Sequence, residues 1–272
     1  MGFLKQVFNL YISSSIHVAL SVYSFTWLTL LTLDLEYSEA VLYFVFYASI
    51  TGYNFVKYFG IAKFRHNTLA SWLKWIQFLS FTSFIAMCYY AFQLKLNTCF
   101  FIACFAVLTF LYAIPVFSKS RKTLRGVRGV KVYVIALVWG GVTVFIPLIN
   151  ADYSITTDSI LLGIQRFLYV LVLMLPFEIR DLKFDSLKLL TIPQKLGVKK
   201  SKTLGVLFLV LVLLLEFFKD ITTINLIIIL FFISFLTAVL LLLSHAKQDK
   251  YYSSFWVEGL PIFWLILVLI FT

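Results

Sequence analysis

The sequence is poor in charge. Asp, Glu, Lys and Arg make up only 13% of its 272 residues, whereas soluble domains carry about 25%. Hydrophobic residues make up 62%, above the roughly 45–50% that is usual in soluble domains. Such a chain has too little polar surface to face water on all sides. The composition therefore excludes a soluble globular protein and indicates an integral membrane protein.

Acidic residues are scarcer than basic ones, 12 against 23, which gives a net charge of +11. In a membrane protein, basic residues mostly mark the cytoplasmic side and attract anionic lipids. The positive charge therefore predicts contact with a lipid bilayer and does not indicate a nucleic-acid partner.

Paired cysteines and a cleavable signal are also missing. Cys88, Cys99 and Cys104 lie in apolar runs and form no C-x-x-C pair, so they predict neither a disulfide framework nor a zinc site. The first apolar run extends to Leu33, which is too long for the core of a signal peptide, and no small-x-small cleavage site follows it. We interpret this run as a retained span.

Long apolar segments fill most of the chain. A membrane-spanning helix needs about 20 apolar residues, and no soluble domain interrupts the pattern. The sequence therefore predicts one all-α domain over residues 1–272, a bundle of nine transmembrane helices. These occupy approximately residues 8–31, 37–56, 72–93, 97–117, 132–149, 160–177, 203–219, 223–244 and 254–272.

Basic residues are distributed unevenly between the loops. With the N-terminus inside, all of the 23 basic residues except Lys95, Arg166 and Lys219 belong to the inner side. This asymmetry predicts an inside N-terminus and an outside C-terminus in the cytoplasmic (inner) membrane, with the charged loops facing the cytoplasm.

Three acids stand together in the stretch PFEIRDLKFDSLKLLTIPQKLG, residues 176–197: Glu178, Asp181 and Asp185. Spacings of three and four residues would place them on one face of a helix. Mg²⁺ usually takes one or two protein carboxylates together with substrate phosphates. Asp181 and Asp185 are therefore candidate metal ligands, with Glu178 as a third candidate. The alternative is that these acids only pair with neighbouring basic residues at a solvated helix end.

Two basic segments are predicted on the same side of the membrane. The loop of residues 118–131 carries six cations, and arginine forks suit phosphate oxygens; an ordinary cytoplasmic loop is the alternative. The segment of residues 51–66 ends the second span. From the two segments the candidates for phosphate contact are Asn54, Lys57, Arg121, Arg125 and Arg128.

The stretch RDLKFDSLKLLTIPQKLG, residues 180–197, resembles the second aspartate-rich motif of the UbiA superfamily of intramembrane prenyltransferases. That motif has D-x-x-x-D, a short basic stretch, a Thr-hydrophobic-Pro segment and Leu-Gly. Asp181 and Asp185 fall on its two aspartates. Nine spans with charged inner loops after spans two and six also resemble the family, as does Leu111–Tyr112 at the end of span four.

The resemblance implies a helical bundle whose central cavity opens to lipid. A polyprenyl diphosphate would bind there through Mg²⁺ held by aspartate-rich motifs, and its prenyl group would pass to an aromatic or lipophilic acceptor. The protein would then be a transferase of alkyl groups other than methyl. Asp181 and Asp185 would be its catalytic metal ligands, and Asn54, with Lys57 beside it in the first motif segment, would contact the diphosphate. Arg121, Arg125 and Arg128 are candidates by charge and position alone.

The first motif of the family, N-x-x-x-D-x-x-x-D, is incomplete in this chain. Asn54 matches its asparagine, but the two aspartate positions hold Tyr58 and Ala62, neither of which can ligate Mg²⁺ as a carboxylate does. The resemblance therefore implies Mg²⁺ held at the second motif, while the first motif supplies no aspartates for a second ion.

Three hypotheses follow from this incomplete motif. In the first, Lys57, with Lys63 or Arg65, supplies fixed positive charge in place of a second metal. In the second, transferase chemistry is lost, and the protein binds an isoprenoid or another lipid or serves as a membrane partner. A small secondary transporter is the third, although the sequence has no clear pair of Gly/Pro-broken spans in corresponding halves.

Overall fold

The protein is described by a computed structural model that covers residues 2–64, 71–113, 129–183 and 190–272. Within these ranges every regular element is a helix, which confirms the all-α prediction. The elements are α1 (Phe3–Ser13), α2 (Ile16–Thr32), α3 (Glu39–Phe64), α4 (Ser71–Ala91), α5 (Leu96–Ala113), α6 (Lys131–Gly140), η2 (Gly141–Phe145), α7 (Ile146–Asn150), α8 (Thr157–Asp181), α9 (Ile192–Glu216), α10 (Ile224–Leu243), η4 (Tyr252–Val257) and α11 (Leu260–Phe271).

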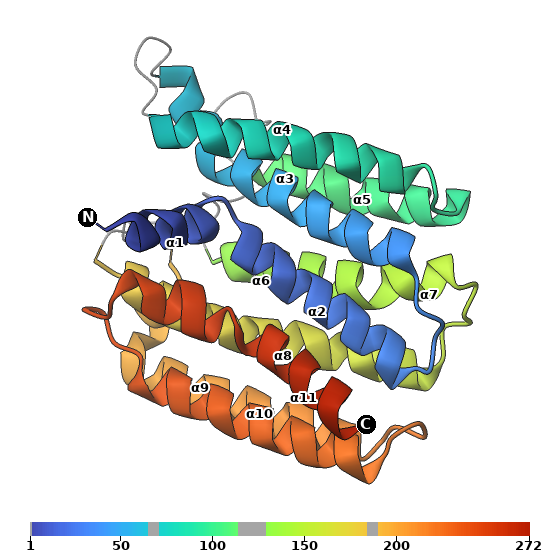
Figure 1. The fold of residues 1–272 in the computed structure, drawn as a ribbon. Helices are drawn as coiled ribbons and strands as arrows, with labels where there is room; N and C mark the ends of the chain where they lie inside the picture. Colours follow the sequence, from blue (N-terminus) through green and yellow to red (C-terminus); the bar gives the residue numbers. More distant parts are fainter. Residues whose placement is uncertain (1, 65–70, 114–128, 184–189) are drawn as a thin grey trace.

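The long helices lie side by side along one direction, and the two chain ends lie at opposite ends of the bundle (Figure 1). Five helical runs in the described part of the chain are long and apolar enough to cross a membrane, and a bent pair, residues 4–13 with 16–32, adds a sixth. The protein is therefore a multi-pass membrane protein. The count of nine spans and the inside N-terminus stay predictions. The five runs are Leu96–Ala113, Lys131–Asn150, Thr157–Asp181, Ile224–Leu243 and Tyr252–Phe271.

The first predicted span is divided in two. The sequence predicted one segment over residues 8–31, whereas the structure has α1 and α2 at an angle of 55°. Ser15 stands between them in the left-handed region, with φ of 65°, and the Ser14 and Ser15 side chains are buried at the break. Serine hydroxyls compete for backbone and neighbouring polar groups, which favours such an interruption. As a result α1 lies at the end of the bundle away from the C-terminus (Figure 1).

Helix α8 runs through the centre of the bundle. It begins at a capping box, in which the Thr156 hydroxyl accepts from Ser159 N at 3.3 Å and the Ser159 hydroxyl accepts from Thr156 N at 2.9 Å. Such a box satisfies two backbone donors at a helix start. Near the other end, the carbonyl of Pro176 accepts from the Gln248 amide at 2.9 Å. The helix ends at Asp181, so it places this acid at one end of the bundle.

Aromatic rings form the centre of the core. The Phe25 ring of α2 meets Trp139 of α6, Tyr169 of α8 and Trp264 of α11, with centroids 5.9–6.0 Å apart and in edge-on geometry. Edge-to-face pairs add about 0.5–1.5 kcal/mol to area burial. The Tyr169 hydroxyl is paired with Thr237 of α10 at 2.6 Å. This cluster holds five helices in register and so positions the helix ends on which the site is built.

Candidate functional site

A cavity of about 490 Å³ opens at the end of the bundle that carries α1. The second half of α3 and the end of α8, far apart in sequence, meet there with the end of α1 and the segment before α11. The cavity therefore joins part of the first-motif segment to part of the second. Its lining residues are Ile12, Ser13, Lys57, Tyr58, Arg180, Asp181, Lys183, Gln248, Lys250 and Ser254.

Positive charge prevails in this cavity. Four of its described lining side chains are cations, Lys57, Arg180, Lys183 and Lys250, against one carboxylate, Asp181. A recess lined by one sign of charge raises the local concentration of the opposite ion. Arginine and lysine are also the usual partners of phosphate oxygens. The cavity is therefore suited to an anion that carries several oxygens.

Asp181 stands at the end of α8 beside its neighbour. The Arg180 Nε donates to Asp181 Oδ1 at 2.8 Å, and the two side chains are 21% and 25% exposed. The Arg180 guanidinium also lies 5.2 Å from the ring centroid of Phe177. Partly exposed ion pairs contribute only about 0–1 kcal/mol, so a metal ion or phosphate could replace this pairing at small cost.

Of the two other acids of the stretch, the structure describes only Glu178, which does not line the cavity with Asp181. The Glu178 carboxylate is 1% exposed and its Oε2 accepts from Ile192 N at 3.2 Å, so it ties α8 to the start of α9 instead of lining the cavity. Asp185 lies outside the described residues. Because α8 ends at Asp181, the stretch is not one continuous helix. The described residues contain no group of three His, Cys, Asp or Glu arranged to hold a metal ion.

Asn54 is a buried link within the bundle. Its Oδ1 accepts from the Ser15 hydroxyl at 2.8 Å, and its Nδ2 donates to Ser14 O and to the Ser80 hydroxyl, both at 2.9 Å. These bonds join α3 to α4 and to the break between α1 and α2. The side chain is 3% exposed and is not among the residues that line the cavity.

Lys57 stands one turn beyond Asn54 and lines the cavity. Its Nζ donates to the Ser15 hydroxyl at 2.8 Å, which in turn donates to Asn54. Tyr58 also lines the cavity, but its hydroxyl donates to the backbone carbonyl of Ser13 at 2.8 Å. The side chain that replaces the first motif aspartate therefore fastens α1 to α3. The side chains of Ala62 and Lys63, and residue Arg65, lie outside the described part, as do Arg121, Arg125 and Arg128.

Two solved structures share the fold of this chain over almost their whole length. A UbiA homolog from Aeropyrum pernix K1, in its apo form, matches with a TM-score of 0.67 and 13% identity over 94% of this chain and 98% of that one. A digeranylgeranylglyceryl phosphate synthase matches with a TM-score of 0.57 and 16% identity over 98% and 96%. The chain has a UbiA-type fold. No family model and no curated protein matches the sequence.

A further carboxylate, that of Glu258, lies near the cavity of this UbiA-type bundle. It was not among the site residues predicted from the sequence. Glu258 lies between η4 and α11, and its charge attracts those of Lys57 and Arg180. An acid within an apolar run is unfavourable in a membrane and by default suggests a functional site. That signal was available in the segment predicted as the ninth span, where Glu258 is the only acid.

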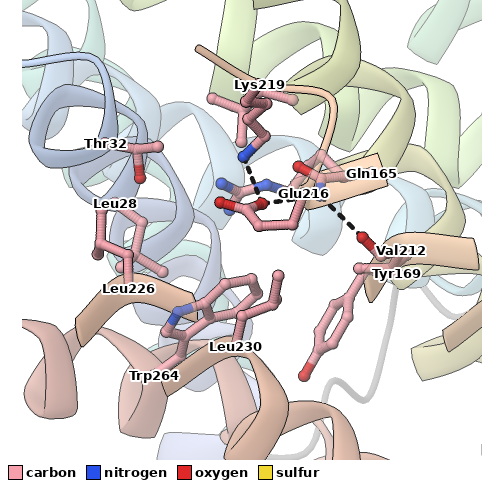
Figure 2. Close-up of a pocket in the computed structure, with 12 residues that line it drawn as sticks. Leu28, Thr32, Gln165, Tyr169, Val212, Glu216, Lys219, Leu226, Leu230 and Trp264 are labelled. Atoms are coloured by element: carbon pink, nitrogen blue, oxygen red, sulfur yellow. Dashed lines mark hydrogen bonds and ion pairs between the residues drawn. The ribbon is translucent and has the colours of Figure 1, made fainter. Parts of the chain in front are cut away.

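A second, much smaller cavity of about 30 Å³ lies in the opposite half of this UbiA-type bundle. There Lys219 Nζ pairs with Glu216 Oε2 at 2.6 Å, and Gln165 Nε2 donates to Glu216 Oε2 at 2.9 Å and to Val212 O at 2.8 Å (Figure 2). The Arg166 guanidinium stacks 4.0 Å from the ring centroid of Phe25. Arg166 and Lys219, assigned to the outer side from the sequence, are both buried. The space admits only water-sized groups, so this network serves to hold the helices together.

Proposed function

We propose that this protein is a membrane-embedded prenyltransferase that binds a polyprenyl diphosphate in the 490 Å³ cavity and transfers the polyprenyl group to an aromatic or lipophilic acceptor. The observation that carries the proposal is the meeting of Lys57 from α3 with Arg180, Asp181 and Lys183 from the end of α8. The UbiA-type fold supports it, because one solved structure of this fold is a digeranylgeranylglyceryl phosphate synthase.

The chemistry of the donors fits one Mg²⁺. A single ion usually takes one or two protein carboxylates, several waters and substrate phosphate oxygens, and Asp181 offers one carboxylate at the cavity wall. Asp185, outside the described residues, is proposed as the second. Bound Mg²⁺ would neutralise charge that develops on the departing diphosphate. Glu178 is given a positioning role in this proposal, because its carboxylate accepts from Ile192 N.

The cations of the cavity would bind and orient the diphosphate directly. Lys57 and Arg180 approach from two different helices, so together they would hold the phosphates between α3 and α8. Donors that are aimed in advance at a departing oxyanion stabilise the transition state. The apolar prenyl chain would remain among the lipid-facing helices, where its hydration cost is absent. Arg121, Arg125 and Arg128 are proposed as further contacts and lie outside the described residues.

The decisive experiment compares binding and turnover in the same purified protein. Labelled polyprenyl diphosphates of several lengths are incubated with candidate acceptors, with Mg²⁺ or with EDTA. We expect release of diphosphate that needs Mg²⁺ and is lost in Asp181→Asn and in Asp185→Asn. Asp152→Asn is a matched control, because Asp152 pairs with Lys95 on the surface, where their side chains are 70% and 48% exposed. If the wild-type protein binds no polyprenyl diphosphate under either condition, the proposal is wrong.

A second function is favoured by one observation. Tyr58 occupies the first motif aspartate position and its hydroxyl is engaged by Ser13 O, so this side offers no carboxylate to a metal. The protein would then bind an isoprenoid or another lipid, or act as a membrane partner, without turnover. Binding of polyprenyl diphosphate with no release of diphosphate for any acceptor would support this second function over the first.

A further inference from the structure

Glu258 is held in a defined place about one helical turn from Ser254, a residue that lines the cavity. Its backbone N donates to Ser253 O at 3.0 Å, and its carbonyl accepts from the Ser21 hydroxyl of α2. Ser254, four residues earlier on the same helical run, lines the cavity. Residues four apart lie on nearly the same face of a helix, so Glu258 lies about one turn deeper on the cavity side of the last helical run.

The surroundings of Glu258 contain charge but no close counter-ion. Its carboxylate is attracted by Lys57 of α3 and Arg180 of α8 and acts on the hydroxyls of Tyr53 and Tyr11. No ion pair of 4.0 Å or less joins it to another described side chain. Two cations of the cavity therefore act on the Glu258 carboxylate, but neither forms a close ion pair with it.

The other polar side chain in contact with this turn is already occupied. A Cβ at Gly259 would lie 3.3 Å from His17 Nε2, which places the His17 ring against the backbone beside Glu258. His17 Nε2 is paired with Phe255 O at 2.9 Å and Nδ1 with the Tyr11 hydroxyl at 2.7 Å. Both ring nitrogens are thus engaged. The His17 ring is therefore held by the bundle and is not placed to take a proton from a molecule in the cavity.

We propose that Glu258 accepts the proton that the acceptor loses when it is prenylated; this inference rests on the proposed function. The bond between C1 of the prenyl group and the diphosphate oxygen breaks, and its electron pair leaves with the diphosphate. An electron pair of the acceptor forms the new bond to C1, and the acceptor proton passes to the Glu258 carboxylate. Solvent in the cavity then takes the proton and regenerates the carboxylate.

This assignment restricts the acceptor. It must carry a removable proton at the reacting centre, as a hydroxyl or a phenol does, and it must be seated deeper than the diphosphate. Asp181 is less suited to the task, because it stands at the cavity mouth and is paired with Arg180. The Tyr58 hydroxyl already donates to Ser13 O. Glu258 therefore has a chemical task that the metal-binding acids do not share.

The first test separates binding from turnover in Glu258→Gln, which keeps the side-chain shape and removes the charge. We expect polyprenyl diphosphate binding and KM within about twofold of wild type, and kcat lower by about 100-fold or more, the usual contribution of a general base. Glu258→Asp should recover part of kcat, and added formate should raise kcat of Glu258→Ala. Glu36→Gln, at an exposed acid in the loop between α2 and α3, is the matched control.

A double variant distinguishes proton transfer from simple neutralisation of Lys57. If Glu258 only offsets that charge, adding Glu258→Gln to Lys57→Gln would not lower kcat further; we expect it to lower kcat about 100-fold below that of Lys57→Gln alone. Unchanged kcat in Glu258→Gln, or no further loss of kcat when it is added to Lys57→Gln, overturns the inference while the transferase function stands. Absence of turnover in the wild-type protein overturns the transferase function and this inference with it.

Discussion

Asn54 makes three hydrogen bonds within the bundle, and replacement by alanine would remove all of them. The partners are the Ser15 hydroxyl, Ser14 O and the Ser80 hydroxyl, at 2.8, 2.9 and 2.9 Å. In a membrane protein each such bond contributes about 0.6 kcal/mol on average, and in soluble proteins about 0.5–1.5 kcal/mol. We therefore expect Asn54→Ala to lower the free energy of unfolding by about 2–4 kcal/mol.

The lower part of that range is favoured by what the partners retain. The Ser80 hydroxyl still donates to Ile76 O at 2.7 Å, and the Ser15 hydroxyl still accepts from Lys57. Only Ser14 O and the Ser15 hydroxyl proton lose a side-chain partner. Reversible unfolding by SDS in mixed micelles measures the change. Asn225→Ala is the control, because the Asn225 side chain makes a single exposed bond to Phe271 O; it should cost less than about 1 kcal/mol.

The same variant decides between two roles for Asn54. A family-based reading assigns it to the diphosphate, whereas the structure encloses it behind the cavity. If Asn54→Ala is as stable as wild type and yet no longer binds polyprenyl diphosphate, the structural role is refuted and direct contact is supported. Reduced stability with binding retained by the folded fraction supports the structural role.

Three further outcomes are expected. Lys57→Met should weaken polyprenyl diphosphate binding about tenfold or more, because a charged hydrogen bond contributes about 1.5–3 kcal/mol. Lys57→Arg keeps the charge and should not weaken binding. Equal dissociation constants for the two variants would exclude a cationic role of Lys57. Tyr58→Phe should cost about 1 kcal/mol in unfolding, through the lost bond to Ser13 O, and leave the Mg²⁺ dependence of binding unchanged; a changed dependence would contradict this. Glu216→Gln should cost about 3–5 kcal/mol, because it leaves Lys219 buried without its counter-ion; an unfolding midpoint equal to that of wild type would show that the pair is dispensable.

Much of this protein was predictable from local sequence properties. Apolar composition and run length predicted a helical membrane protein, which the structure confirms; the count of nine spans stays a prediction. The sequence also predicted that Lys57 and Asp181 lie at the same end of the bundle. Each of them follows an apolar segment, on the side of the membrane where most basic residues are predicted. Hydropathy and charge asymmetry depend on neighbouring residues, so they can be read without knowing the fold.

Tertiary structure alone decided which polar side chains serve the cavity. Asn54 is bonded to Ser15 and Ser80, and Glu178 to Ile192, partners that a motif does not reveal. Glu258 is brought near Lys57 from the far end of the sequence. Whether a polar group faces a cavity or a neighbouring helix depends on how helices rotate as their apolar faces pack. That rotation is set by contacts between distant segments, and no local pattern contains it.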